Sequence, residues 1–286
     1  MTPKSEFLEA RGLRFHYRDW GGDGQPLVLL HGLSSSSRIW DFVAPALARR
    51  FRVVAVDQRG HGLSDSPDSD YTFEEVGGDF AALIGAMGLD RPALVGHSWG
   101  ASVALYHAAN HQADVQALVL VDGGMTDIAA ALSWEAAAKL MTPPHIDGVD
   151  VDTFVGFARN WPHLRDVWSP QLQEMVLSNF LIEDGKVYRR LRVENHMKVV
   201  RAIYDMPPSS LYPKIGCPVL LVPALSEPAN DRERAWQDYQ KRGAESALRL
   251  LPDSRLNPMQ DTAHDVPVLR PRELAEAIGS FLESLA

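Results

Sequence analysis

The chain has 286 residues, enough for one large domain or two small ones. Hydrophobic residues make up 45% of it and charged residues 23%, which excludes a disordered chain, a coiled coil and a collagen-like fibre. The longest apolar runs are strand-sized, and none approaches the roughly 18 residues of a membrane helix, so we expect no membrane span.

Acidic residues outnumber basic ones by 37 to 28, for a net charge of −9. Nucleic-acid binders usually carry a basic surplus, so we expect no nucleic-acid partner. The single cysteine, Cys217, excludes a disulfide framework and a zinc cluster built on thiolates. The first residues lack the apolar core of a signal peptide, so the expected location is the cytoplasm. We expect a monomer or a homodimer.

The first 121 residues alternate between short apolar runs and helical patterns. Strands are predicted at 7–9, 13–18, 27–30, 52–56, 93–95 and 115–121. Helices are predicted at 39–48, 72–87 and 101–109, the second of them capped by Thr72. Strands that alternate with helices predict a mostly parallel sheet with helices on both faces.

The alternation breaks between residues 125 and 210, where helical patterns and prolines occur without a strongly apolar strand. It resumes with a strand at 219–222, a helix at 232–241, a strand at 247–251 and a helix at 272–285. These patterns predict a core domain of eight strands, formed by residues 1–124 and 211–286. Residues 125–210 are predicted to form a helical insertion.

The strongest local motif is Gly96-His97-Ser98-Trp99-Gly100, a G-x-S-x-G directly after an apolar strand and before a helix of small residues. In a nucleophile elbow, the serine occupies a tight strand-to-helix turn with a strained backbone. The flanking positions must lack Cβ atoms, which would collide with the adjoining strand and helix. The motif in this context therefore predicts Ser98 as a nucleophile.

A second motif, His31-Gly32-Leu33, follows the strand at 27–30. An oxyanion hole needs two backbone N–H groups that converge on one point, one after the nucleophile and one from a neighbouring loop. The N–H groups of Leu33 and Trp99 are the candidates, and Gly32 lets the backbone approach closely. The side chain of His31 is interpreted as structural.

The segment Asp57–Asp65 follows the strand at 52–56 and contains two glycines among polar residues. One interpretation makes Asp57, Arg59 and His61 catalytic. The preferred interpretation is a buried turn whose side chains satisfy backbone groups, because turns of this composition commonly do so.

His264 lies in Asp261-Thr262-Ala263-His264-Asp265, before the closing helix. A serine hydroxyl needs a base with a pKa near 7, which histidine offers without perturbation. The chain has ten histidines, and chain order selects His264, since the base comes last in proteins with this type of elbow.

Together, His31-Gly32, Asp57–Asp65, Gly96–Gly100 and His264 resemble the ordered motifs of the α/β-hydrolase superfamily, in particular its cap-bearing serine hydrolases of esterase or lactonase type. The resemblance covers nearly the whole predicted core. It implies an α/β-hydrolase fold in which residues 125–210 form a cap over the site. It implies no cofactor and no metal, and it leaves the reaction open because one fold hosts many chemistries.

The chain departs from this family at the triad acid. Relatives usually follow the strand equivalent to 218–222 with a glycine and an aspartate, but here Glu227 stands where the aspartate is expected. A second acid position of the fold, after the preceding strand of the sheet, is occupied by Asp122. Asp122 is the leading candidate, Glu227 its rival and Asp231 a third choice. The acid must reach the far ring nitrogen of His264.

Ser98 restricts the reaction, because the dehalogenases and epoxide hydrolases that resemble this chain carry aspartate at the elbow. A serine suits attack on an acyl carbonyl, which predicts hydrolysis of an ester or lactone of a small to medium apolar acyl substrate. Two alternatives stay open, a hydrolase of carbon–carbon bonds in diketo acids and a non-catalytic ligand receptor. In the first, a basic residue of the insertion such as Arg159, Arg165 or Arg190 would bind the carboxylate.

Overall fold

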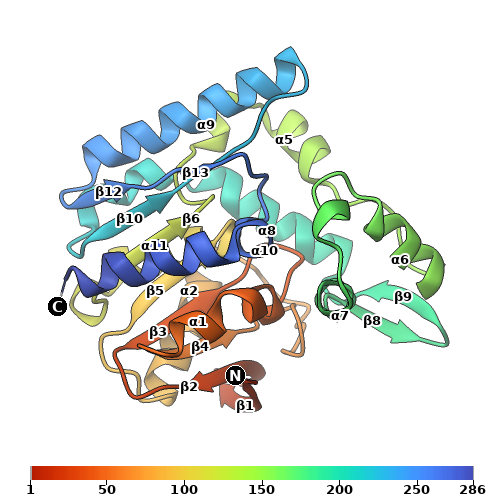
Figure 1. Cartoon of the computed structure of the whole chain (residues 1–286), viewed down its shortest axis with the longest axis horizontal. Coiled ribbons are helices and arrows are strands. Elements are labelled where there is room, and N and C mark those ends of the chain that lie inside the picture. The colour runs from red at the N-terminus through yellow and green to blue at the C-terminus, as the bar shows by residue number, and fades with distance from the viewer. Residues whose placement is uncertain (1, 286) are drawn as a thin grey trace.

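The central element of the computed structural model is an eight-stranded sheet (Figure 1). The structure describes residues 2–285, without the side chain of Arg232. The strand order is β1-β2-β4-β3-β5-β6-β10-β12, in which β2 is antiparallel to β1 and β4 and the other neighbours are parallel. The predicted mostly parallel sheet is therefore confirmed. Its strands are β1 (Lys4–Ala10), β2 (Leu13–Gly21), β3 (Pro26–Leu30), β4 (Arg52–Val56), β5 (Ala93–His97), β6 (Leu118–Val121), β10 (Val219–Val222) and β12 (Ser254–Leu256). A separate pair joins β11 (Ala224–Leu225) to β13 (Met259–Gln260).

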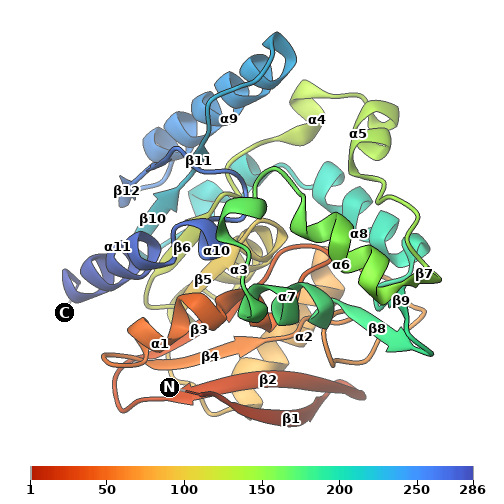
Figure 2. The ribbon, with the colours of Figure 1, turned by 45° about the vertical axis from the view of Figure 1, so that its right-hand side comes forward.

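Helices cover both faces of this sheet (Figures 1 and 2). One face is covered by α1 (Ala44–Leu47), α10 (Val266–Leu269) and α11 (Pro271–Glu283), and the other by α2 (Phe73–Ala86), α3 (Trp99–Asn110) and α9 (Asp231–Leu250). Short 3-10 helices occupy Ser37–Phe42, Gln112–Asp114 and Tyr212–Lys214. Within residues 2–285, we find no helix with the length and hydrophobicity needed to span a membrane.

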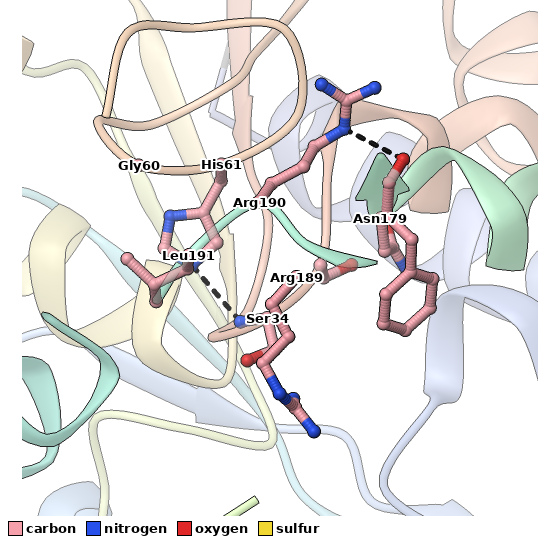
Figure 3. A pocket seen from close by; sticks show the side chains of 9 residues that line it. Ser34, Gly60, His61, Asn179, Arg189, Arg190 and Leu191 are labelled. Carbon is pink, nitrogen blue, oxygen red and sulfur yellow. Dashed lines mark hydrogen bonds between the residues drawn. The ribbon is translucent and has the colours of Figure 1, made fainter. Parts of the chain in front are cut away.

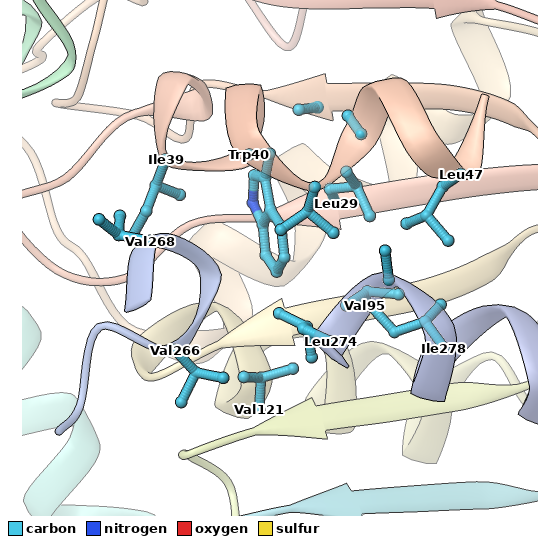
Figure 4. Close-up of a cluster of buried hydrophobic side chains, with 14 of the residues drawn as sticks. Leu29, Ile39, Trp40, Leu47, Val95, Val121, Val266, Val268, Leu274 and Ile278 are labelled. Atoms are coloured by element: carbon cyan, nitrogen blue, oxygen red, sulfur yellow. The ribbon is translucent and has the colours of Figure 1, made fainter. Parts of the chain in front are cut away.

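The central strands are continuous apolar runs because both of their faces are buried. Successive side chains of a strand point to opposite faces, so Val95 of β5 packs on one side and Leu94 on the other. Figure 4 shows the first side, where Trp40, Leu274 and Ile278 pack against the sheet. All three side chains are completely buried. This core fixes the carboxyl ends of β3, β5 and β6, from which the candidate site residues extend.

The strand predicted at 247–251 is wrong, because residues 247–250 are the last turn of α9. Ala244, Ala247 and Leu251 are buried at a spacing of three and four residues, which is a helical period. The segment is also rich in Ala, Glu, Leu and Arg, all strong helix formers. The eighth strand is β12, which follows this helix.

Other predicted elements differ in extent, among them the helix predicted at 232–241, which spans Asp231–Leu250 as α9. The helix predicted at 39–48 is divided into the 3-10 helix Ser37–Phe42 and α1, with Pro45 in the first turn of α1, where proline is tolerated. The strand predicted at 115–121 pairs only from Leu118 onward. The cap of α2 is as predicted, since the Thr72 side chain accepts the N–H of Glu75 at 3.3 Å.

Residues 125–210 were expected to be helical, but they also contain a three-stranded antiparallel sheet in the order β7-β9-β8. The turn between β8 and β9 is Asp184-Gly185, and both residues have positive φ (48° and 72°), as two-residue hairpins with this sequence require. Figure 2 shows these elements gathered at one side of the molecule. They are α4 (Ile128–Ala131), α5 (Trp134–Met141), β7 (Val149–Asp150), α6 (Val151–Arg159), α7 (Pro170–Ser178), β8 (Phe180–Glu183), β9 (Lys186–Arg189) and α8 (Val193–Asp205), with 3-10 helices at Arg165–Val167 and Pro208–Ser210.

Candidate active site

Ser98 occupies the turn between β5 and α3, with φ 55° and ψ −120°. A positive φ is strained for a residue with a side chain, as expected of a nucleophile elbow. A Cβ on Gly96 would overlap the backbone of Ala101, and one on Gly100 would lie 2.5 Å from the carbonyl oxygen of Leu30. Gly96 therefore allows β5 and α3 to meet in this turn, and Gly100 allows α3 to pack against the end of the neighbouring strand β3.

A chain of hydrogen bonds links Ser98, His264 and Asp122. The Oγ of Ser98 lies 2.9 Å from Nε2 of His264, and the Nδ1 of His264 lies 2.6 Å from Oδ2 of Asp122. The other carboxylate oxygen of Asp122 accepts the N–H of Ala224 at 2.9 Å. The side chain of Asp122 is only 6% exposed, whereas that of His264 is 53% exposed. The arrangement can therefore move a proton from Ser98 to His264 beside a surface open to solvent.

Of the three candidate acids, the structure brings only Asp122 to His264. Asp122 follows β6 with φ 44°, and its N–H donates to the carbonyl of Val222 at 2.9 Å. Glu227 and Asp231 are exposed, and within residues 2–285 neither hydrogen-bonds to His264. The geometry thus favours Asp122 as the residue that orients the ring.

The electrostatics of His264 are dominated by carboxylates. Loss of hydrating water lowers the pKa of His264, but the hydrogen bond and charge of Asp122, with the charge of Asp265, raise this pKa to about 9. Asp265 itself lies 3.2 Å from Nε2 of His163 in the insertion. Burial raises the pKa of Asp265, yet His163 and His264 outweigh it and bring this pKa to about 2. The surroundings therefore stabilise the imidazolium that forms when Ser98 loses its proton.

The two predicted oxyanion donors belong to segments that adjoin Ser98. A Cβ on Gly32 would be 3.1 Å from the Cβ of Ser98 and 3.5 Å from its Oγ, so the loop that carries Leu33 passes close to Ser98 at residue 32. Trp99 is the first residue of α3. Among the described residues, no protein acceptor takes a hydrogen bond from the N–H of Leu33 or of Trp99. Such free donors can bind a negatively charged oxygen.

Two buried histidines hold the backbone around these donors. The Nε2 of His31 accepts the N–H of Gln58 at 3.1 Å, and the Nε2 of His61 accepts the N–H of Ser34 at 3.1 Å. The ring of His61 also lies 5.2 Å from that of Trp99. Burial lowers the pKa of His61 to about 3, so the ring stays neutral. Both histidines therefore support the loops rather than touch Ser98.

The Asp57–Asp65 turn is tied together by its own polar groups. Asp57 accepts the N–H groups of Ser37 at 2.6 Å and Leu63 at 2.9 Å, and Arg59 pairs with Asp79. These contacts satisfy buried backbone donors and a buried charge, as the preferred interpretation of this segment requires.

Sequence reasoning missed His97, the residue before the candidate nucleophile. Its Nε2 lies 2.8 Å from the carbonyl oxygen of His264, and the two rings are 4.8 Å apart. Burial, followed by the nearby His264, lowers the pKa of His97 to about 4. His97 is therefore neutral and ties the loop of His264 to the elbow. Its position inside the G-x-S-x-G motif was the available signal.

A small pocket lies beside the loop that follows Leu33 (Figure 3). Arg190 contributes to it and donates through Nε to the carbonyl of Phe180 at 3.1 Å. Arg159 and Arg165, the other candidate carboxylate binders, are exposed on the insertion. No cluster of three or more potential metal ligands occurs within residues 2–285. The pocket is lined by Ser34, Ser35, Gly60, His61, Asn179, Phe180, Arg189, Arg190 and Leu191.

Curated relatives match the chain over part of its length. N-formylmaleamate deformylase from Pseudomonas putida is 43% identical over 116 residues, which are 40% of this chain and 43% of that enzyme. A soluble epoxide hydrolase from Corynebacterium sp. is 40% identical over 111 residues, 39% of this chain and 38% of that enzyme. Each match spans less than half of the relative.

Solved structures match over the whole chain. The crystal structure of E-2-(acetamidomethylene)succinate hydrolase has a TM-score of 0.79 and covers 98% of this chain and 99% of its own, at 23% identity. That of an enol-lactonase from Burkholderia xenovorans has a TM-score of 0.68 and covers 97% of this chain and 100% of its own, at 19% identity. At such identities, the likeness establishes the fold. The model of the alpha/beta hydrolase family matches residues 27–277, most of the sequence. The chain therefore belongs to the alpha/beta hydrolase family.

Proposed function

We propose that this protein is a serine hydrolase that cleaves a carboxylic ester or lactone of a small to medium apolar substrate through an acyl-enzyme. Ser98 is the nucleophile, His264 the base and Asp122 the acid that orients it. The N–H groups of Leu33 and Trp99 form the oxyanion hole. The observation that carries this proposal is the continuous hydrogen-bonded chain from Ser98 through His264 to Asp122.

In the acylation step, the Oγ of Ser98 attacks the carbonyl carbon while its proton moves to Nε2 of His264. The negative charge that develops on the carbonyl oxygen is stabilised by the N–H groups of Leu33 and Trp99. Collapse of this intermediate breaks the ester bond, and His264 gives the proton to the leaving oxygen. In a lactone, that oxygen stays attached to the acyl group.

In the deacylation step, water takes the place of the leaving group. His264 removes a proton from this water, which attacks the acyl carbon, and the proton then returns to Ser98. Asp122 stays ionised throughout and holds Nδ1–H of His264 in the required tautomer. These steps use side chains and backbone groups alone, so the proposal includes no cofactor or metal.

A second candidate reaction is cleavage of a carbon–carbon bond in a diketo acid by the same residues. Arg190 favours it, because this cation lines a pocket beside the loop that carries Leu33. Amides also belong among the test substrates, since one relative is named as a deformylase. The cytoplasmic location and the monomeric or dimeric state stay predictions.

The proposal is tested with a fluorophosphonate probe and peptide mapping, followed by a hydrolysis screen over esters of increasing acyl length, lactones, amides and a diketo acid. We expect an adduct at Ser98 and the highest kcat/KM on an ester or lactone. The Ser98→Ala variant should lose at least about a thousandfold in kcat while its melting temperature is kept. If no adduct forms at Ser98, the serine mechanism is wrong. If the diketo acid is turned over fastest, the second candidate reaction is favoured.

A further inference from the structure

A second hydrogen-bonded series of Ser, His and Asp lies outside the candidate active site. The Oγ of Ser5 is 2.7 Å from Nε2 of His16, and the Nδ1 of His16 is 2.7 Å from Oδ2 of Asp57. Ser5 lies on β1, an edge strand of the sheet, four strand positions away from the β5 strand that leads into Ser98 (Figure 1). The proposed hydrolase mechanism uses none of these three side chains.

Strand pairing brings the three residues together. In the antiparallel β1–β2 pair, His16 is opposite Phe7, which places Ser5 diagonally across from the imidazole. Asp57 follows β4 on the other side of β2, and its N–H donates to the carbonyl of His16 at 2.9 Å. The side chains of His16 and Asp57 are 3% and 2% exposed, whereas Ser5 is exposed. A buried base and acid thus lie beneath a surface hydroxyl.

The ionisation of Asp57 decides which group of His16 faces it. Burial raises the pKa of Asp57, but the hydrogen bond from His16 and neighbouring donors lower this pKa to about 2. An ionised carboxylate only accepts hydrogen bonds, so Nδ1 of His16 carries the proton that faces Asp57. When the ring is neutral, its Nε2 keeps a lone pair that can accept the hydroxyl proton of Ser5 at 2.7 Å. This is the orientation required of a general base.

We propose that Ser5 is a covalent modification site for acyl or phosphonyl donors with a good leaving group, activated by His16 and Asp57. With a fluorophosphonate, the Oγ of Ser5 forms a bond to phosphorus while the phosphorus–fluorine bond breaks. The hydroxyl proton passes to Nε2 of His16, and fluoride leaves with the bonding electrons. Ser5 lies in a regular β-strand, whose N–H groups point sideways. Unlike the N–H groups of a helix N-terminus, they do not converge on the nucleophile. Modification of Ser5 is therefore slower than that of Ser98 and leaves a lasting adduct.

The test uses the full chain with Ser98→Ala, so that its result does not depend on the proposed hydrolase activity. The protein is treated with a small fluorophosphonate, and peptide mass spectrometry follows the adduct at Ser5 and at Ser280 over time. Ser280 is a matched control, because it is also exposed and no histidine contacts its Oγ among the described residues. We expect Ser5 to react at least about tenfold faster than Ser280, because a positioned general base typically contributes about 10²–10⁴-fold.

The variant His16→Asn separates activation from mere exposure. The amide of asparagine can still donate to Asp57 in place of Nδ1, but it has no group at the position of Nε2. The adduct at Ser5 should then form only as fast as that at Ser280, with the melting temperature recorded as a check on folding. The proposal is wrong if Ser5 reacts no faster than Ser280 in the chain that keeps His16. It is also wrong if Ser5 reacts as fast in folded His16→Asn as in the chain that keeps His16. The first comparison decides the matter even if His16→Asn does not fold.

Discussion

The Oγ of Ser34 lies 3.0 Å from Nδ1 of His196, a contact that joins the loop after Leu33 to helix α8 of residues 125–210. The N–H of Ser34 donates in the opposite direction, to Nε2 of His61 at 3.1 Å. His196 is held in turn by the carbonyl of Met141, 2.8 Å from its Nε2. Ser34 has φ 58°, a conformation that a residue with a side chain rarely adopts unless its surroundings hold it. The loop is therefore fixed from both the core and the insertion.

We predict that Ser34→Ala lowers kcat about tenfold and changes KM by less than about threefold. The substitution removes the bond to His196 that helps to hold residue 34 at its positive φ. Residue 34 can then relax, and the neighbouring N–H of Leu33 should lose its alignment. A small displacement of an oxyanion donor acts mainly on the transition state, where the charge develops. Steady-state kinetics on the best ester or lactone measure both constants.

Ser36→Ala is the matched control for Ser34→Ala. The Oγ of Ser36 also contacts the insertion, at 2.8 Å from Oδ1 of Asn179 and 3.0 Å from Oγ of Ser178, but it lies farther from Leu33. We expect kcat of this variant within about twofold of the wild type. Equal losses in both variants would mean that general attachment of the insertion, rather than the alignment of Leu33, sets the rate.

The pH dependence of kcat/KM should reflect the raised pKa of His264. The base must be neutral in the free enzyme, and Asp122 holds its pKa near 9, so activity should rise with pH and its acid limb should lie above 6.5. This is more alkaline than the fall below about pH 6–7 expected of an unperturbed histidine. In Asp122→Asn, the acid limb of the residual activity should lie at lower pH, since the charge that raises the pKa of His264 is gone. A profile that is flat from pH 8 down to pH 5 would contradict the role of His264.

The sequence predicted best those features that depend on neighbouring residues. The elbow at Ser98 is specified by glycines two positions away on each side, whose absent Cβ atoms leave room for α3 and for the end of β3. The strand predicted at 247–251 failed because a short apolar run can be a strand or the end of a helix, and the preceding residues extend α9.

Features that join distant segments were harder to predict. The choice between Asp122 and Glu227 stayed open because it depends on how the ends of two adjacent strands are placed, which no local pattern encodes. The series from Ser5 through His16 to Asp57 was not predicted at all, since only the pairing of three strands brings these residues together. The contact between Ser34 and His196 likewise depends on how the insertion packs on the core.

Asp57 should make the free energy of unfolding depend on pH in the acid range. Its pKa is about 2 in the folded protein against 3.8 for a free side chain, so its ionised form stabilises the fold above pH 3.8, and this contribution is lost as the pH falls toward 2. The shift corresponds to about 2 kcal/mol in the free energy of unfolding. We therefore expect Asp57→Asn to be less stable than the wild type at pH 7, and the difference to shrink by about that amount near pH 2. Urea unfolding at several pH values measures this, and a difference independent of pH would contradict it.

The two candidate acids, Asp122 and Glu227, are separated by substituting each with its amide. Asp122→Asn keeps the shape of the side chain but removes the charge that stabilises protonated His264, and it allows the wrong tautomer of the ring. We expect kcat to fall at least about a hundredfold, because the same change costs about 10⁴ in a serine protease. The carboxylate of Glu227 is exposed, so Glu227→Gln should change kcat less than about tenfold.

Both variants must be compared at equal concentrations of folded enzyme, because Asp122 also accepts the N–H of Ala224, and an amide there can weaken the fold. The folded fraction of each variant, measured by urea unfolding, supplies that concentration. A large loss in Glu227→Gln with little loss in Asp122→Asn would transfer the role of acid to Glu227, which requires the loop after β11 to move onto His264. A large loss only in Asp122→Asn would place the acid after β6, one strand earlier in the sheet than in the usual arrangement of the family.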